Sequence, residues 1–334
     1  MLEQKQMQLG GAKGLKKTLL IESGTGRSAV QRLKSERWRR IVRNRWMYFL
    51  AVPGIIYFLI FKYLPMWGIV IAFQNYQPFL GISGSDWVGL QHFVRFFTDD
   101  KFWLLLKNTS VLAVFNIVFF FPLPIIVALM LNELRHEIYK RFLQTLIYVP
   151  HFVSWVVVVG IVYIFFSNEE GVINNLLVQL GFEKINFLLS KSMFPYMITS
   201  EVIWKDTGWG TIIFLAALAG VDTSLYESAK LDGAGRWRQI WHITLPSIRS
   251  TIVILFILRL GQFLDTSFEQ IFLMLNASTR EVGEVYDTYV YMTGIRQGQF
   301  SYSAAVGLFK SVVGFVLVVI ANTLAKKMGE EGVY

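Results

Sequence analysis

The chain has 334 residues, of which 54% are hydrophobic and only 16% charged, and its mean hydropathy is +0.46. These values favour a polytopic membrane protein over a soluble one. The formal net charge of +9 does not indicate nucleic-acid binding, because the basic residues gather at the ends of apolar runs, where they anchor membrane proteins on the cytoplasmic side. Disulfides, thiol catalysis and cysteine-ligated metals are excluded, since the sequence contains no cysteine.

Residues 1–44 are polar and basic, with many Gly, Ser and Lys residues. They contain no short apolar region followed by a cleavage site, so we expect no cleaved signal peptide. We interpret the segment as a disordered cytoplasmic tail. Contact with anionic lipid or with an ATPase is the alternative interpretation of its charge.

Six apolar runs are long enough to cross a hydrocarbon core, which takes roughly twenty helical residues each. They cover about residues 46–73, 110–131, 142–166, 193–221, 251–274 and 302–325. Several of them contain proline, including Pro53, Pro122, Pro124 and Pro150, and membrane helices tolerate proline because neighbouring groups satisfy the freed carbonyls. The sequence therefore predicts an all-α membrane protein in which residues 45–334 form one domain of six transmembrane helices.

Basic residues set the expected orientation, because cytoplasmic loops carry an excess of Lys and Arg. Three cationic segments follow the N-terminal tail, residues 1–44. The first contains Arg135, Lys140 and Arg141, the second Lys230, Arg236, Arg238 and Arg249, and the third Lys326 and Lys327. An even number of spans puts all of them on one side, so we expect both termini in the cytoplasm. The opposite loops, about 75–105, 167–192 and 275–300, would face outward and are large enough to receive a solute or a protein.

A polar stretch, "ESAKLDGAGRWRQIWHITLP", lies between the fourth and fifth apolar runs. Ser224 and Glu227 have the spacing of a capping box, which predicts a short helix that begins near Leu225. Gly233 and Gly235 predict a turn, since glycine adopts positive φ at little cost. A second short helix would then follow to Leu245 and Pro246. Local physics predicts a cytoplasmic hairpin over 222–246 and leaves open whether it docks a partner or merely lies at the membrane interface.

The spacing within this stretch resembles a known motif. The stretch consists of Glu-Ser-Ala, three residues, Gly, nine residues, Ile, one residue and Leu-Pro. This spacing is similar to the EAA-x3-G-x9-I-x-LP loop of binding-protein-dependent ABC importer permeases, with Ser228 in place of Ala. "DGAGRW", "SFEQIFLM" and the C-terminal "FSYSAAVGLFKSVVGFVLVVIANTLAKK" resemble the carbohydrate branch of that family, which includes the maltose importer membrane subunits. More narrowly, the chain looks like the polysaccharide or lipoprotein-type permease subgroup.

The resemblance implies a type I ABC importer permease fold in the bacterial cytoplasmic membrane, working by alternating access. It implies that the hairpin is a coupling helix that inserts into a cleft of the ATPase, through Glu227, Ser228, Ala229, Asp232, Gly233, Gly235, Leu245 and Pro246. The implied partners are a second homologous permease subunit, a dimer of ATP-binding subunits, an extracytoplasmic solute-binding protein and an oligosaccharide substrate.

The chain shows no ATP-binding motif of its own. "GGAKGLKK" lacks the G-x4-G-K-[ST] spacing of a phosphate loop. We therefore expect no cofactor on this chain, with ATP and Mg²⁺ bound by the partner ATPase. The four histidines are scattered, and no metal site or paired-carboxylate motif stands out, which argues against a membrane-embedded enzyme. Internal repeats typical of secondary transporters are not evident either.

Polar residues inside apolar runs are the candidates for the substrate pathway, because charges in a membrane are expensive and usually face a cavity or a partner. The candidates are Asn116, Lys205, Asp206, Arg259, Gln262, Asp265 and Glu269, with Lys310 in the last run. The spacing of Arg259, Gln262, Asp265 and Glu269 predicts one polar stripe on a helix. Structural pairing, such as Lys205 with Asp206, is the alternative for any single residue.

The predicted function is ATP-driven import of oligosaccharides. The cations Lys205, Arg259 and Lys310 favour an acidic, uronate-containing sugar, although nearby carboxylates leave a neutral sugar open. Another solute class, such as peptides or lipoprotein-derived ligands, is the alternative within the same family.

Overall fold

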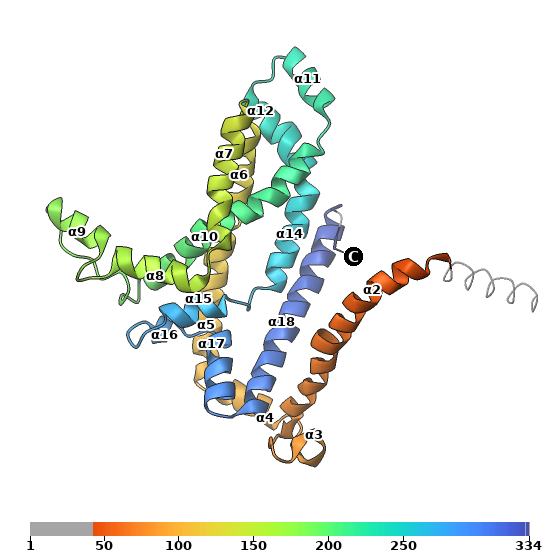
Figure 1. Cartoon of the computed structure of the whole chain (residues 1–334), viewed down its shortest axis with the longest axis vertical. Coiled ribbons are helices and arrows are strands. Elements are labelled where there is room, and N and C mark those ends of the chain that lie inside the picture. Colours follow the sequence, from red (N-terminus) through yellow and green to blue (C-terminus); the bar gives the residue numbers. More distant parts are fainter. Residues whose placement is uncertain (1–42, 331, 334) are drawn as a thin grey trace, which may run out of the picture. The chain divides into compact units, whose positions relative to one another are not determined.

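The computed structural model describes residues 43–330 and 332–333, so the interpretation of residues 1–42 as a tail lies outside the described residues. The chain divides into two compact units, Met1–Gly68 and Ile69–Tyr334. The elements are labelled in Figure 1.

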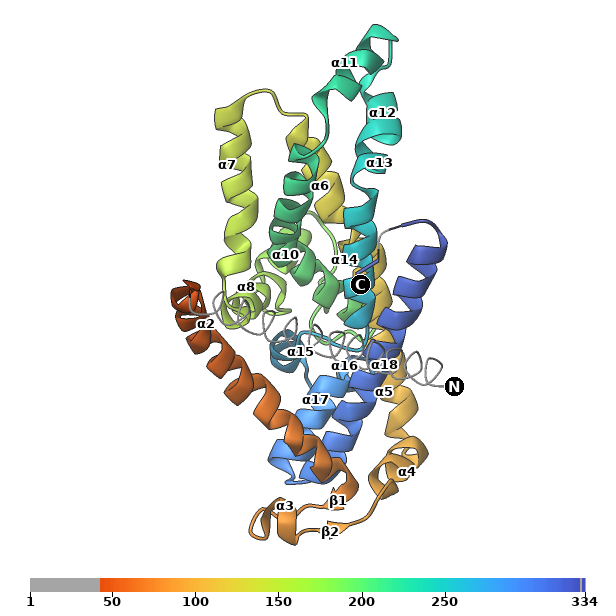
Figure 2. The same cartoon turned by 90° about the vertical axis from the view of Figure 1, so that its right-hand side faces the viewer.

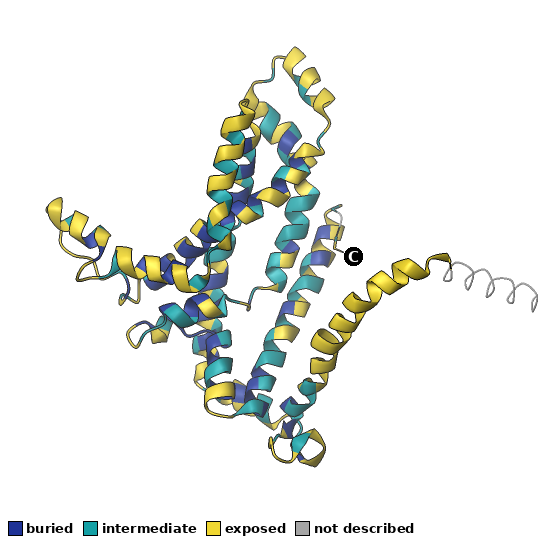
Figure 3. Ribbon diagram, in the orientation of Figure 1, coloured by how far each residue is buried: buried dark blue, intermediate teal, exposed yellow. Residues whose placement is uncertain are grey.

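In the described part of the first unit the chain is one apolar helical path, α2 (Arg45–Phe58) and η1 (Leu59–Tyr63), which η2 (Leu64–Phe73) continues. No residue of α2 or η1 is buried, and Figure 3 shows α2 in the exposed colour along its length. Phe49 and Leu50 are 67% and 78% exposed. An apolar helix with so much free surface is suited to lipid or to a protein partner.

The second unit begins with a short hairpin and then a long helical run. Strands β1 (Gln74–Asn75) and β2 (Asp86–Trp87) pair antiparallel, with Gln74 opposite Trp87, around α3 (Gly81–Gly84). After α4 (Gln91–Thr98), the elements α5 (Lys101–Phe115), η3 (Asn116–Phe120) and α6 (Pro122–Asn132) form one helix. This helix begins before the predicted residue 110, because the Asp99 carboxylate accepts a hydrogen bond from the Lys101 N–H at 2.9 Å and satisfies a first-turn donor.

The run expected at 142–166 is not a straight helix. α7 (Glu137–Tyr148) and η4 (Val149–Phe152) are followed by α8 (Trp155–Phe166), and the two arms are bent by 100°. Pro150 lies in η4, and Ser154 starts α8 by accepting a hydrogen bond from the Val157 N–H at 3.4 Å. α9 (Val172–Gln179) follows. The bend places the backbone carbonyl oxygens of His151 and Val153 each 2.6 Å from the Lys205 ammonium.

Helix α10 (Phe194–Ala219) covers the fourth predicted run without a break, although "WKDTGWG" is polar. Its glycines allow close packing. A Cβ on Gly208 would lie 2.1 Å from the backbone oxygen of Ile147, and one on Gly210 would lie 2.9 Å from Pro124. α10 therefore packs directly against α7 and α6.

The polar stretch forms α11 (Thr223–Leu231), α12 (Arg236–Gln239), η5 (Ile240–Thr244) and α13 (Leu245–Ser247). Figure 2 shows this hairpin at one end of the unit, where it leads into α14 (Arg249–Gly261). The path bends by 60° between Arg236–Ser247 and Arg249–Gly261.

The fifth predicted run, 251–274, is two helices rather than one. α14 ends at Gly261, and α15 (Phe268–Met274) begins only after a non-helical segment, residues 262–267. Within it, the Thr266 N–H donates to the Asp287 carboxylate at 3.0 Å instead of to a helical carbonyl. The prediction of a single polar stripe on this helix is therefore wrong, because a side chain far along the sequence competes for the backbone.

The chain ends with α16 (Arg280–Gly283), α17 (Tyr286–Val290), η6 (Tyr291–Arg296) and α18 (Phe300–Lys327), the last of which covers the sixth predicted run. Among the described residues, four helices are long and apolar enough to cross a membrane, or six if each of the two bent pairs forms one span. Most of the buried apolar residues lie between α5, α8, α10, α15, α17 and α18. This core surrounds the two backbone breaks.

Candidate functional site

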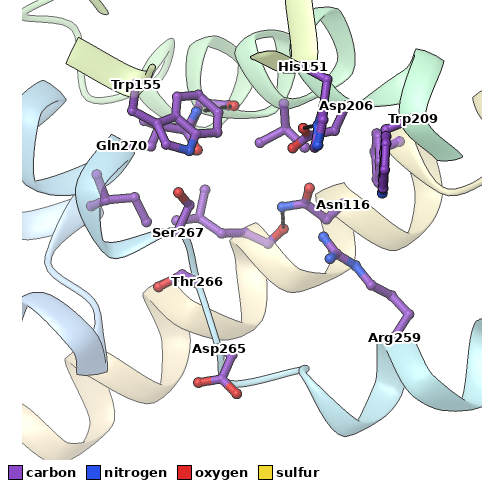
Figure 4. A pocket seen from close by; sticks show the side chains of 15 residues that line it. Asn116, His151, Trp155, Asp206, Trp209, Arg259, Asp265, Thr266, Ser267 and Gln270 are labelled. Carbon is purple, nitrogen blue, oxygen red and sulfur yellow. Dashed lines mark hydrogen bonds and ion pairs between the residues drawn. The ribbon is translucent and has the colours of Figure 1, made fainter. Parts of the chain in front are cut away.

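A polar cavity of about 340 Å³ lies where the two breaks meet α10 (Figure 4). Its lining comes from five parts of the second unit: Leu112, Asn116 and Phe120; His151 and Trp155; Ile198, Val202, Asp206 and Trp209; Arg259; and Asp265, Thr266, Ser267, Gln270 and Ile271. Of the predicted pathway residues, Asn116, Asp206, Arg259 and Asp265 line it. Lys205, Gln262 and Glu269 do not.

His151 and Asp206 form a polar pair on the cavity wall. His151 Nδ1 lies 2.9 Å from Asp206 Oδ1, and the imidazole stacks on Trp209 with ring centroids 4.5 Å apart and planes 9° apart. The stacked indole fixes the plane of the imidazole, and the pair uses one oxygen of the carboxylate. Asp206 is therefore partnered by His151 rather than by its neighbour Lys205.

Lys205 has a structural partner set of its own. Its ammonium donates to the carbonyl oxygens of His151 and Val153, each at 2.6 Å, and the side chain is buried. These carbonyls belong to the break between η4 and α8, where helical partners are missing. Lys205 thus stabilises the bend that places His151 and Trp155 at the cavity.

Arg259 is the cation at the cavity, near the end of α14. Among the described residues it makes no ion pair within 4.0 Å, although its charge interacts with that of Asp206. Its guanidinium carbon lies 5.5 Å from the centroid of the Phe120 ring. Across the cavity, Asn116 donates to Leu112 O at 2.9 Å, and its Oδ1 has no hydrogen-bond partner in the described part of the chain. Figure 4 shows the Arg259 and Asn116 side chains directed toward each other.

The non-helical segment forms another wall. Asp265 pairs with Lys310 of α18, and Lys310 also binds Asp287. Asp287 in turn accepts from the backbone N–H and the hydroxyl of Thr266, at 3.0 and 3.2 Å. Lys310 therefore shares its one positive charge between the Asp265 and Asp287 carboxylates, and α17 and α18 together hold residues 265–267 in place.

Sequence reasoning missed His151, Trp155, Thr266, Ser267 and Gln270 as cavity residues. A signal existed for two of them: His151 follows a proline in an apolar run, and Gln270 is an amide that follows Glu269 and precedes the apolar residues 271–275. Nothing in the sequence placed either one beside Arg259. No group of three or more His, Asp or Glu side chains in residues 43–330 and 332–333 is arranged to hold a metal ion.

The hairpin at the other end of the unit starts differently from the prediction. Asp222, not Ser224, is the cap: its Oδ1 accepts from the Ser224 N–H at 2.9 Å, and α11 starts at Thr223. This backbone hydrogen bond lowers the pKa of the Asp222 carboxyl. The predicted capping box of Ser224 and Glu227 is therefore wrong, because the stronger acceptor two residues earlier takes the cap position.

The turn confirms one glycine prediction and corrects another. Gly233 has φ +74°, and the bonds from Gly233 N to Lys230 O and from Ala234 N to Ala229 O, at 3.1 and 2.8 Å, close the end of α11. Gly235 has φ −68° and is extended backbone before α12, so positive φ is not its role. The Ser228 hydroxyl donates to Ser224 O at 3.0 Å. The helix therefore accommodates serine at the position where the family motif has alanine.

A second polar cavity, of about 750 Å³, lies under the hairpin. Its lining includes Glu133 and Arg135 after α6, and Glu227, Lys230, Gly235 and Arg236 of the hairpin. Leu231 and Trp237 are 90% and 76% exposed. Leu245 and Pro246 begin α13, just before the 60° bend into α14. An exposed apolar tip on a capped turn is a surface suited to a protein partner.

Comparison with known proteins decides the family. Residues 120–330 match the family described as "Binding-protein-dependent transport system inner membrane component". The chain belongs to this family. It is 58% identical over 295 residues to the polygalacturonan/rhamnogalacturonan transport system permease protein YteP of Bacillus subtilis (strain 168), covering 88% of this chain and 92% of YteP. It is 54% identical to Protein LplB of the same organism, over 94% of this chain and 96% of LplB.

Solved structures agree with the fold. A bacterial alginate ABC transporter, solved in complex with an alginate pentasaccharide-bound periplasmic protein, has a chain that superposes with TM-score 0.81 at 39% identity, covering 89% of this chain and 99% of that one. The family resemblance drawn from the hairpin motif is thus confirmed. The chain is a multi-pass membrane permease of the sugar-transporting ABC class, and its family is one of transport permeases rather than enzymes.

Proposed function

We propose that this chain is a permease subunit of an ATP-driven importer of acidic oligosaccharides in the bacterial cytoplasmic membrane. The observation that carries the proposal is Arg259, a cation that lines a polar cavity and makes no ion pair among the described residues. A charge within a membrane segment is costly unless it meets a partner. A uronate carboxylate would supply that partner through charge-assisted, bidentate hydrogen bonds.

The other cavity residues suit a sugar. Asp206 is hydrogen-bonded to His151, and Asp265 shares Lys310 with Asp287, so both carboxylates of the cavity have partners within the protein. Trp155 and Trp209 supply aromatic surface for the apolar face of a pyranose ring. The unpaired Asn116 Oδ1 is an acceptor for a hydroxyl. The cavity thus combines one cation with acceptors and aromatic rings, as a uronate requires.

The relatives support the acidic class. YteP is named for polygalacturonan and rhamnogalacturonan, and a second solved relative, at 40% identity and TM-score 0.79, is involved in import of the acidic polysaccharide alginate. Relatives named for arabinooligosaccharides and lactose share only 26% and 28% identity. A neutral oligosaccharide is the second candidate, and the interaction of Arg259 with Asp206 is the observation that favours it.

The partners of the proposed cycle follow from the same family. An extracytoplasmic binding protein would deliver the sugar, a second permease subunit would complete the pathway, and a dimer of ATPase subunits would bind ATP and Mg²⁺. Closure of that dimer would act on the hairpin through Glu227, Ala229, Asp232 and Gly233. The rigid caps of α11 and the bend after Pro246 would transmit the movement to α14, which carries Arg259.

The experiment that tests this function is uptake and ATP hydrolysis by the reconstituted complex, with trigalacturonate and arabinotriose supplied separately. Stimulation by trigalacturonate is expected. Arg259→Gln should reduce uptake of trigalacturonate by roughly 10-fold or more, since a hydrogen bond to a charged group is worth about 1.5–3 kcal/mol. Arg249→Gln removes a cation from the other end of α14, where it pairs with Glu330, and should have little effect. Equal stimulation by both sugars, unchanged in Arg259→Gln, would reject the acidic class.

A further inference from the structure

Glu201 is a buried carboxyl for which the proposed cycle has no use. It lies on α10, is 4% exposed, and does not line the polar cavity. It lies instead at an apolar cavity of about 460 Å³, with Val158, Val162 and Trp204. Its Oε1 has no hydrogen-bond partner in the described part of the chain. A carboxyl in such surroundings is costly, so its one polar contact must offset much of that cost.

That contact is with Gln270. Gln270 Nε2 donates to Glu201 Oε2 at 2.8 Å and to the Ile198 carbonyl oxygen at 2.8 Å. Gln270 is itself 1% exposed, yet it lines the polar cavity. A primary amide has two N–H donors and one carbonyl oxygen. Both donors are therefore used on the α10 side, and the carbonyl oxygen is the function left for the cavity.

The two acceptors also fix which way round the amide lies. If the amide were turned over, its oxygen would face the Ile198 carbonyl and the Glu201 carboxyl, which are acceptors as well. A backbone carbonyl alone would leave one donor of Gln270 unsatisfied, and a buried unpaired donor is expensive. Glu201 thus completes the pair of acceptors that holds the amide in one orientation.

We propose that Glu201 is a positioning residue for the substrate: through Gln270 it presents a fixed carbonyl acceptor to the cavity, which binds a sugar hydroxyl. This inference rests on the proposed function and adds to it a further hydroxyl acceptor, besides Asn116 Oδ1. A uronate carries carboxylate acceptors, which suit the donors of Arg259, and hydroxyl donors, which suit the Gln270 carbonyl. A cation and a fixed acceptor bind different groups of the same sugar and so orient it in the cavity.

The alternative is that Glu201 merely ties α10 to α15. A double-mutant cycle separates the two roles, because a residue that acts only through Gln270 has no effect once Gln270 is gone. In the reconstituted complex, with trigalacturonate as substrate, Glu201→Leu and Gln270→Leu should each raise the KM for uptake about 3- to 10-fold, as expected for one hydrogen bond, with kcat little changed. The double variant should have the KM of Gln270→Leu.

Two further variants sharpen the cycle. Glu201→Gln keeps a carbonyl that can accept from Gln270 and should return the KM to within about twofold of wild type, a small fraction of one hydrogen bond. Ser200→Ala is the matched control: Ser200 precedes Glu201 on α10, lines the same apolar cavity and donates its hydroxyl to Met197 O at 2.8 Å. Its KM should be unchanged.

The inference is overturned if the KM effects of Glu201→Leu and Gln270→Leu multiply, or if Glu201→Leu lowers kcat at unchanged KM. Glu201→Met replaces Glu201→Leu if the latter fails to accumulate in the membrane. If neither Glu201→Leu nor Glu201→Met accumulates in the membrane while Gln270→Leu does, the inference is also overturned, since Glu201 would then act independently of Gln270. A wild-type complex that transports arabinotriose but not trigalacturonate would instead contradict the proposed function.

Discussion

The hairpin over residues 222–247 and the polar cavity are built by different kinds of contact. In the hairpin, the Asp222 cap and the Ser228 hydroxyl bond reach two and four residues along the chain, and α11 and α12 bury no residue. In the cavity, His151 meets Asp206 across 55 residues and Gln270 meets Ile198 across 72. One region is a locally determined element with a free surface, and the other exists only after distant segments have packed.

This difference explains how one permease could contain both a hairpin that a partner moves and a site that binds a solute. A hairpin held by its own caps keeps its shape while a partner moves it, because few of its bonds cross to the rest of the fold. The cavity wall is the reverse, since His151, Arg259 and Gln270 come from separate segments of the chain that line the cavity together with α10. Movement of α14 would therefore change the cavity while leaving the hairpin intact. Substitutions in the two regions should accordingly fail in different ways.

The largest effect is expected at Gly208 in the packed region. A side chain there would place Cβ 2.1 Å from the Ile147 backbone oxygen, and backbone cannot move aside as a flexible side chain does. Gly208→Val should prevent accumulation of folded protein, measured as the monodisperse peak of a fluorescent fusion in detergent. Gly160→Ala in α8, where nothing lies within 4 Å, is the control and should accumulate normally. Normal accumulation of Gly208→Val would show that the α7–α10 contact is looser than described.

A smaller but specific effect is expected at Lys310. Removing Lys310 leaves two carboxylates unpaired, at a cost below the about 3–5 kcal/mol of a fully buried pair, because the Asp265 side chain is more than half exposed. Lys310→Gln should therefore lower the thermal stability of the complex and reduce uptake of trigalacturonate, since Asp265 would face the cavity uncompensated. Adding Asp265→Asn and Asp287→Asn should recover much of the stability. A triple variant no more stable than Lys310→Gln would mean that the cluster does not act through charge.

In the exposed region, Gly233→Asp should leave the protein folded and inserted but abolish transport. Its φ of +74° costs a non-glycine residue roughly 1–2 kcal/mol, and Asp also adds a charge at the turn proposed to enter the ATPase. The measurement is uptake beside ATP hydrolysis in the same proteoliposomes. Gly160→Ala in α8, outside the hairpin and with nothing within 4 Å, should transport normally. Full uptake by Gly233→Asp would remove the hairpin from the coupling path.

The same contrast decides what the sequence could predict. Apolar runs and the turn glycine depend on nearby residues, so the helices of α10 and α18 and the positive φ of Gly233 followed from pattern alone. The cavity did not. The sequence spacing predicted one helical stripe of Arg259, Gln262, Asp265 and Glu269. The helix is interrupted because the Thr266 N–H donates to the Asp287 carboxylate. Gln262 and Glu269 are therefore exposed and do not line the cavity. A bond between residues 21 positions apart leaves no trace in local periodicity.

The prediction from local sequence was also wrong at the start of α11, where two residues could act as the N-cap. Asp222 and Ser224 both favour an N-cap, and the sequence pattern with Glu227 selected the wrong one. The charged acceptor prevailed because a carboxylate binds a backbone N–H more strongly than a hydroxyl does. The span boundaries at 142–166 were missed for a different reason, since the bend at residues 149–154 depends on Lys205 from α10.

The smallest effect is expected at Asp222, whose contribution to the stability of the hairpin also depends on pH. The folded-state pKa of this carboxyl is lowered by the Ser224 hydrogen bonds, so its stabilisation of the hairpin is fully present above the unfolded pKa of about 3.9 and is lost as the pH falls through the lower folded value. Asp222→Ala should increase amide exchange in residues 223–231 slightly and equally from pH 5 to 8, once intrinsic rates are corrected. Asp222→Asn keeps an uncharged acceptor at the cap and should remain close to wild type at pH 7. If wild type and Asp222→Ala exchange alike at pH 7, the cap is not what holds the start of α11, and the hairpin must depend on contacts with α6 or with a partner.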